Sequence, residues 1–142
     1  MRFIMVVVWA LILGVFTCTG SLRALFYHQH IRFEWNPLPD FDDLFITNDF
    51  DTVHAHWVII KFGHFLGFAL LDILLYLYLK HRSSSVTISA LFAVFTEILQ
   101  LYFNRDGRLY DMAIDIAGVI FSAQLIPFIN RISEGVFQHE KT

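Results

Sequence analysis

The sequence has little charge and almost no cysteine, and each shortage excludes a class of protein. Only 16% of the 142 residues are Asp, Glu, Lys or Arg, whereas soluble domains contain about 25%. The net charge of −3 offers no basic surface of the kind that nucleic acids need, so we expect no nucleic-acid partner. Cys18 is the single cysteine and cannot form a disulfide within the chain. We interpret it as a packing residue.

Hydrophobic residues are abundant instead, at 56% of the chain against about 45–50% in soluble domains. They fall in four runs, and a helix that spans a bilayer needs about 20 largely apolar residues. We therefore predict an all-α integral membrane protein, a four-transmembrane-helix bundle that forms a single domain over residues 1–142. The predicted spans lie at about residues 3–19, 57–79, 86–103 and 111–129.

The first apolar run is short for a span, and two interpretations remain open. A cleaved signal peptide has a basic start, an apolar centre and a small-residue cleavage site, and Arg2 and the stretch 17–21 partly match this pattern. We favour a retained helix. The three later runs predict a membrane protein in either case.

Residues 20–56 separate the first two spans and are polar and irregular. Pro37 and Pro39 interrupt any helix there, and acidic residues outnumber basic ones. Aromatic residues are interleaved with the acids, and so long a loop is uncommon unless it folds back on something. We predict an irregular extracytoplasmic loop that lies against the membrane surface.

Basic residues beside the spans set the predicted orientation, because cytoplasmic loops carry an excess of Lys and Arg. The hairpin 80–85 contains Lys80 and Arg82 but no acidic residue. We therefore place this hairpin and both termini in the cytoplasm, and the loop 20–56 and the hairpin 104–110 outside. A polar tail is expected from Asn130 onward.

Ionisable residues inside the predicted spans gather at one depth. A charge at the centre of a bilayer costs about 2.5–3.5 kcal/mol on insertion scales and marks a candidate functional site. The rise of about 1.5 Å per residue puts residues of three spans at a similar distance below their outer ends, and each set shares one helical face. With Arg105 from the adjoining hairpin, this predicted polar layer comprises Lys61, His64, Glu97, Gln100, Arg105, Asp111 and Asp115.

Two interpretations of this layer stay open. It could consist of ion pairs and hydrogen bonds that hold the helices together, with Lys61 or Arg105 neutralising nearby carboxylates. It could instead be a pocket, open to the outer surface, that binds a polar ligand or carries out chemistry. Asp72 lies deeper in its span, where we expect a hydrogen bond to Ser89 or Gln124; a proton-relay role is the alternative.

Three ordered motifs resemble those of the VanZ-like family over about residues 57–125. They are KFGHF from Lys61 followed by Phe68 and Leu71, EILQ from Glu97, and RDGRLYD from Arg105 continuing to Asp115 and Gly118. Their ordered combination is more specific than any one of them. The chain departs from the family pattern at three positions: Phe68 stands where Tyr is frequent, Asp115 stands where Asn is frequent, and Arg108 is additional.

The resemblance implies a protein of the bacterial cell membrane, because the family is named for a membrane protein that raises resistance to the glycopeptide teicoplanin. Our first hypothesis is a non-enzymatic envelope protein that binds an outer-leaflet lipid, a lipid-linked cell-wall precursor or a glycopeptide and so affects teicoplanin susceptibility. Membrane lipids are then its partners. Lys61 and Arg105 would hold an anionic head group. The oligomeric state is left open.

The alternative is a membrane-embedded enzyme that acts on an envelope lipid or cell-wall precursor through His64, Glu97, Asp111 and Asp115. These side chains could act as acid–base groups or metal ligands, but no local metal-binding motif occurs and the layer has no Ser or Cys nucleophile. We therefore predict no metal and no cofactor and assign no catalytic residue. A small proton-coupled transporter is a third hypothesis, which depends on Asp72.

Overall fold

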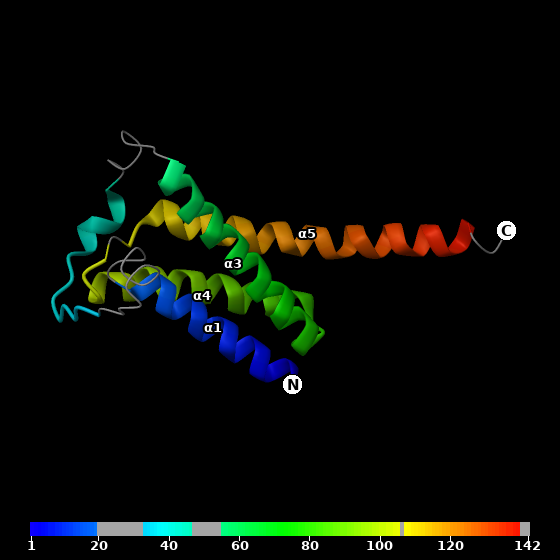
Figure 1. Ribbon diagram of the computed structural model, residues 1–142, viewed down its shortest axis with the longest axis horizontal. Helices are drawn as coiled ribbons and strands as arrows, with labels where there is room; N and C mark the ends of the chain where they lie inside the picture. Colours follow the sequence, from blue (N-terminus) through cyan, green and yellow to red (C-terminus); the bar gives the residue numbers. More distant parts are fainter. Residues whose placement is uncertain (20–32, 47–54, 106, 140–142) are drawn as a thin grey trace.

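The computed structural model describes residues 1–19, 33–46, 55–105 and 107–139, and all regular structure in them is helical. The elements are α1 (Arg2–Cys18), the 3-10 helix η1 (Phe41–Phe45), α3 (Ala55–Leu79), α4 (Arg82–Tyr102) and α5 (Leu109–His139). Figure 1 shows α1, α3 and α4 beside the first half of α5, which then extends beyond the bundle. The predicted all-helical class is confirmed.

Helix α3 lies at the centre of the bundle and packs against α5, α4 and α1. Its side chains Phe68, Leu71 and Leu75 are buried in the hydrophobic core, which α1 extends with Val6 and Leu13. The indole Nε1 of Trp9 in α1 also donates to the backbone oxygen of Gly67 at 2.9 Å. The first apolar run is therefore an integral part of this core.

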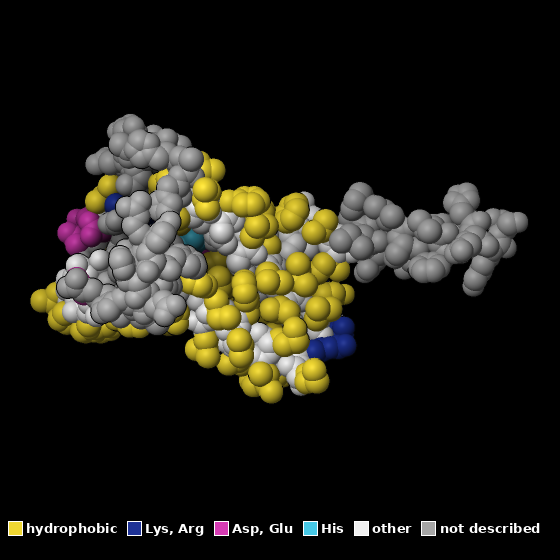
Figure 2. All heavy atoms as spheres, in the orientation of Figure 1, with side chains coloured by type: hydrophobic (Ala, Val, Ile, Leu, Met, Phe, Trp, Pro, Cys, Tyr) yellow, Lys and Arg dark blue, Asp and Glu magenta, His cyan; other side chains and the backbone are white. Residues whose placement is uncertain are grey.

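Three helices are long and apolar enough to cross a membrane: Trp57–Leu79, Arg82–Tyr102 and Leu109–Pro127. Helix α1 is apolar but shorter, with 17 residues. Figure 2 shows hydrophobic side chains over the outward faces of the helices, and they include Ile59, Leu91 and Phe95. Outward apolar faces on this scale suit contact with lipid, because large exposed apolar patches are rare on soluble monomers.

The two ends of the bundle differ. At the end that we call the hairpin end, Lys80 with a φ of 56° closes α3, and α4 begins at Arg82. The Arg2 guanidinium donates to the Leu77 oxygen at 3.4 Å, so α1 begins at this end. The opposite end, which we call the loop end, carries residues 33–46. Figure 2 shows acidic side chains at the loop end and basic ones at the hairpin end.

Two helix boundaries differ from the predicted spans. Helix α4 begins four residues before the predicted start at residue 86, because His81 caps its first turn by accepting a hydrogen bond from the Ser84 backbone N–H at 3.4 Å. Helix α5 continues through Pro127 to His139, so it extends beyond the predicted end of the span at residue 129 and includes most of the polar tail.

The described part of the predicted loop, residues 33–46, folds onto the end of α4. The Asn36 backbone N–H donates to the Tyr102 oxygen at 2.7 Å, and Trp35 stacks on the Tyr102 ring at 5.4 Å between centroids. Phe41 in η1 also contacts this ring, edge to face. Aromatic stacking therefore anchors this segment to the bundle, whereas the rest of the loop lies outside the described residues.

Candidate functional site at the loop end

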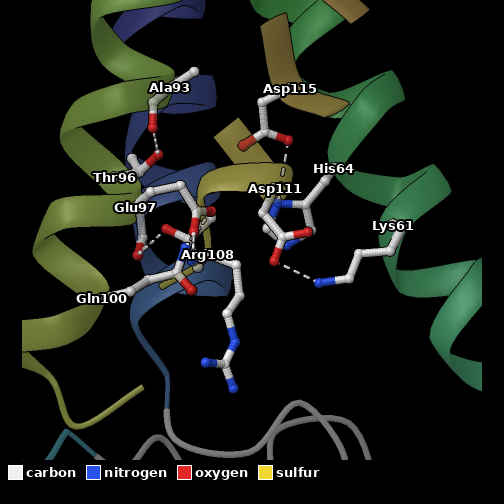
Figure 3. Close-up of polar contacts among 11 residues, drawn as sticks. Lys61, His64, Ala93, Thr96, Glu97, Gln100, Arg108, Asp111 and Asp115 are labelled. Atoms are coloured by element: carbon white, nitrogen blue, oxygen red, sulfur yellow. Dashed lines mark hydrogen bonds and ion pairs between the residues drawn. The ribbon is translucent and has the colours of Figure 1, made fainter. Parts of the chain in front are cut away.

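Polar side chains from α3, α4 and α5 meet inside the bundle near its loop end, as Figure 3 shows. We call this set the loop-end cluster. Its members are Lys61, His64, Glu97, Gln100, Asp111 and Asp115. These are the predicted layer without Arg105, and their proximity follows from the helix packing. The described geometry therefore brings together six of the seven residues predicted from the sequence.

Two ion pairs join α3 to α5 within the loop-end cluster. The Lys61 Nζ lies 2.6 Å from Asp111 Oδ2, and the His64 Nδ1 lies 3.4 Å from Asp115 Oδ1. The Lys61 ammonium also sits over the rings of Trp57 and Tyr110, at 5.5 and 5.1 Å from their centroids. Lys61 therefore neutralises Asp111, as expected if the layer consists of ion pairs that hold the helices together.

Glu97 of α4 receives its hydrogen bonds from uncharged donors. Its Oε1 accepts from Gln100 Nε2 at 2.6 Å, and its Oε2 accepts from the Arg108 backbone N–H at 3.0 Å. Gly107 makes the second contact possible, because a Cβ at this position would collide with the Glu97 backbone oxygen. Helical spacing predicts that Glu97 lies in the layer, but it predicts neither the Arg108 N–H as its donor nor the close approach of Gly107.

A second glycine sets the distance between α3 and α5. A Cβ on Gly118 would overlap the backbone oxygen of Phe65. Because Gly118 has no side chain, the backbones of α3 and α5 can come into direct contact at this level. Phe65 follows His64, and Gly118 lies one turn from Asp115. The close contact therefore holds the His64 and Asp115 side chains near each other.

The two arginines of the 104–110 hairpin point to other partners. The Arg105 Nη1 donates to the Thr19 oxygen at 2.5 Å, and the Arg108 Nη1 donates to the Asp43 oxygen at 2.9 Å. Of the two cations considered, Lys61 is the one paired with Asp111, because the Arg105 side chain ties the end of α1 to the hairpin. Arg108 ties the segment 33–46 to the cluster. Asp106 of this hairpin lies outside the described residues.

Burial makes the loop-end cluster chemically unusual. Glu97 and Asp115 are both 0% exposed, and within the described ranges neither forms an ion pair with a lysine or arginine. The Asp115 Oδ2 has no hydrogen-bond donor there either. Buried carboxylates are ordinarily paired or bound to a metal, because removing a charge from water is costly. The cluster therefore holds acceptor capacity that the described residues leave unused.

One subset of the cluster has the geometry of a metal-ligand set. His64, Glu97 and Asp115 each offer one ligand atom, and these three atoms all lie within 4.8 Å of one another. One imidazole nitrogen and two carboxylate oxygens are donors that divalent metals accept. In the alternative enzyme hypothesis these side chains are possible metal ligands, whereas the sequence-based prediction is that no metal is bound; this remains a prediction.

A second buried polar group lies toward the hairpin end, and we call it the hairpin-end cluster. Asp72 Oδ2 accepts a hydrogen bond from Ser122 Oγ at 2.5 Å and lies 3.0 Å from the Arg82 Nη1. The expected partners of Asp72, Ser89 and Gln124, were wrong; Ser89 Oγ has no partner in the described part of the chain. Arg82 was missed because it was assigned to a hairpin and not to the start of α4.

The helices and these buried ionisable groups define an all-helical membrane protein with a polar site between its helices. The VanZ/LLP1 family model matches residues 3–130, and the chain belongs to this family. It is also 31% identical over 111 residues to "Uncharacterized membrane protein YwnJ" of Bacillus subtilis (strain 168), covering 78% of this chain and 79% of the relative. No solved structure matches the chain. The family assignment made from the three motifs is thus confirmed.

Proposed function

We propose that this protein is a four-span component of the bacterial cell envelope that binds an anionic lipid or a lipid-linked cell-wall precursor at the loop-end cluster. The observation that carries the proposal is the set of buried ionisable side chains that three helices bring together, with the partly exposed ammonium of Lys61 among them. Intramembrane ionisable residues that converge in this way are functional candidates by default.

The proposed orientation has the loop end outside and both termini in the cytoplasm, with α1 as the fourth span. The basic hairpin end and the acidic loop end support this direction. The packing of Val6 and Leu13 of α1 into the core supports retention of α1 in the bundle. Cysteine labelling of an exposed loop-end position, Asp42→Cys, should therefore proceed with a membrane-impermeant maleimide on intact cells. Labelling only after the cells are lysed would contradict this orientation.

Lys61 is the proposed contact to an anionic head group. Its side chain is 16% exposed, and it lies between two aromatic rings at the loop end. An incoming phosphate could share the ammonium with Asp111, because a lysine binds phosphate as a point charge with three donors. Arg105 is proposed to assist from the adjoining hairpin.

Lipid binding can be tested directly with the purified chain in nanodiscs that contain a polyprenyl pyrophosphate. We expect native mass spectrometry to show the lipid retained by the wild type and lost from Lys61→Met. The matched control is Lys80→Met, which removes a lysine at the hairpin end. Equal retention by all three proteins would contradict the proposal.

An effect on teicoplanin susceptibility is the cellular part of the proposal. Deletion and overexpression should change both the inhibitory concentration of teicoplanin and the binding of the antibiotic to the cell surface. If both stay unchanged, the resistance part is wrong. In the same cells, Glu97→Ala and Asp111→Ala separate two roles: normal accumulation with a lost phenotype supports a site, whereas loss of folded protein supports a purely structural layer.

A membrane-embedded enzyme is the second candidate, and the proximity of His64, Glu97 and Asp115 favours it. These groups could supply acid–base chemistry toward an envelope lipid or cell-wall precursor. Mass spectrometry of a lipid-linked precursor after incubation with the reconstituted protein would show a product that Asp115→Asn fails to form. An unchanged precursor would leave the binding function as the better account.

A further inference from the structure

We propose that His64, Glu97 and Asp115 form a binding site for one divalent transition-metal ion inside the helix bundle. The three residues come from α3, α4 and α5, and their ligand atoms all lie within 4.8 Å of one another. Figure 3 shows that the His64 and Asp115 side chains face each other across the bundle, with Glu97 reaching in from α4. The site is thus assembled by tertiary packing and not by a local motif.

The distances suit a metal after small side-chain rotations. Oxygen and nitrogen ligands bind Zn²⁺ at about 2.0–2.2 Å in tetrahedral geometry, so two ligand atoms of one ion are about 3.4 Å apart. His64 Nδ1 and Asp115 Oδ1 already have this separation, at 3.4 Å. The upper limit of 4.8 Å among the three atoms leaves a contraction of up to about 1.4 Å for the third ligand. Rotation about the side-chain bonds can supply this without a helix movement.

The unsatisfied state of Asp115 points to a ligand independently of these distances. Asp115 is fully buried, and its Oδ2 accepts no hydrogen bond from the described residues. Its other oxygen has the His64 ring nitrogen at 3.4 Å as its contact. A cation between the two side chains would neutralise the carboxylate and coordinate the imidazole, which removes the cost of burying an unpaired charge.

The Glu97 carboxylate is hydrogen-bonded in the way that ligating carboxylates are in protein metal sites. Hydrogen bonds to a ligating carboxylate orient it and are nearly as important as the ligand itself. Glu97 has two such bonds, from Gln100 Nε2 and from the Arg108 backbone N–H. These bonds fix its carboxylate while leaving one lone pair on each oxygen for a cation.

The donor set selects a class of metal. Imidazole suits Zn²⁺ and other transition metals, and carboxylates also accept Mn²⁺. Three protein ligands leave at least one coordination position open, which is the arrangement of catalytic metal sites and not of closed structural ones. A water molecule or an oxygen of an anionic ligand could occupy that position. The metal site stands independently of the lipid-binding proposal, because it needs no lipid to form.

Metal binding can be measured on the full chain, purified in detergent with a tag that contains no histidine and stripped with a chelator. After incubation with Zn²⁺ or Mn²⁺ and gel filtration, we expect mass spectrometry of the elements to find about one ion per chain for at least one of the two metals. His64→Gln, Glu97→Gln and Asp115→Asn should each bind that metal at least about tenfold more weakly. His81→Ala and Asp42→Asn are the matched controls, because both residues are exposed, and they should bind like the wild type.

The unfolding temperature of each protein is also measured with and without the metal. This comparison distinguishes a variant that folds but does not bind the metal from a variant that fails to fold. A ligand that binds only the folded state raises the unfolding temperature, so the wild type and the two controls should gain stability on addition of the metal. The three site variants should fold but gain nothing. A wild type that retains neither Zn²⁺ nor Mn²⁺ would overturn the proposal, as would site variants that bind the metal as tightly as the wild type.

Discussion

The two buried polar clusters of this protein both contain fully buried carboxylates but differ in how these charges are balanced. In the hairpin-end cluster, Asp72 has an arginine at 3.0 Å and a serine hydroxyl at 2.5 Å. In the loop-end cluster, Glu97 and Asp115 are equally buried but have no lysine or arginine partner in the described residues. A balanced pair holds helices together, whereas unbalanced carboxylates keep capacity for a ligand.

The position of each cluster agrees with this difference. Arg82 reaches Asp72 from the first residue of α4, so the pair links α4 to α3, and Ser122 adds α5. The arginine side chain is 27% exposed, whereas that of Asp72 is fully buried. The loop-end cluster instead lies beneath residues 33–46, which connect to it through Arg108. The hairpin-end cluster is thus paired across α3, α4 and α5, whereas the loop-end cluster contains two buried carboxylates without a lysine or arginine partner in the described residues.

The largest expected effect is the loss of the arginine from the hairpin-end cluster. Arg82→Ala leaves Asp72 buried without its cation, and breaking a buried ion pair from one side costs about 3–5 kcal/mol. We expect a large fall in the unfolding temperature in detergent and in the amount of folded protein in the membrane. The double variant Asp72→Asn/Arg82→Ala should recover much of this loss. An unchanged unfolding temperature for Arg82→Ala would contradict the assignment of this cluster as a lock.

The second effect concerns the contact that brings the loop-end residues together. Gly118→Ala adds a methyl group against the Phe65 backbone, and overpacking of this kind costs about 1–3 kcal/mol. We expect lower thermal stability together with loss of metal retention, because His64 and Asp115 move apart. Gly63→Ala is the matched control: it lies one residue from His64 but has open space around it. If both variants behave alike, the close approach of α3 and α5 is not what holds the cluster.

A smaller effect is expected where the loop is anchored to α4. Trp35→Ala removes the ring stacked on Tyr102, and aromatic pairs contribute about 0.5–1.5 kcal/mol beyond their buried area. Limited proteolysis should cut the chain near residues 33–46 sooner in this variant than in the wild type. Leu38→Ala serves as the control, since Leu38 is strongly exposed. Equal cleavage rates would show that the stacking does not anchor this segment.

The smallest change in stability is expected in the loop-end cluster itself, measured without added metal. Asp115→Asn removes a buried charge that lacks a lysine or arginine partner, so the free energy of unfolding should stay within about 1 kcal/mol of the wild-type value or rise slightly. Asp72→Asn, which removes a paired carboxylate, should lower it. A large loss for Asp115→Asn would place both clusters in the same structural role and remove the contrast between them.

Much of the loop-end cluster could be predicted from the sequence, because helix geometry is regular. Lys61 and His64 lie three residues apart, as do Glu97 and Gln100, so each pair had to share a helical face. A consistent topology then placed the pairs at one depth. The boundaries were less predictable: α4 begins early because His81 caps it, and α5 continues past the polar residues after position 129.

The partners of individual side chains could not be predicted, because they depend on how the helices rotate and how closely they approach. Depth counting suggested Ser89 or Gln124 for Asp72, but the rotation of α5 brings Ser122 instead. Arg105 was a reasonable partner for Glu97 by distance along the chain, yet its side chain turns to the Thr19 oxygen. Long side chains at helix ends can reach several acceptors, and only packing selects one.

Hydropathy alone determined that this protein belongs in a membrane, since a low content of charge and long apolar runs leave few other environments for such helices. The sequence motifs also determined its family, and helical spacing determined which polar residues share a face. Tertiary structure decided the rest. The close approach of α3 and α5 at Gly118, with α4 beside them, places ligand atoms of His64, Glu97 and Asp115 within 4.8 Å of one another. At the other end, the long side chain of Arg82 reaches Asp72. Both outcomes depend on sub-ångström packing, which hydrophobic pattern and residue spacing do not encode.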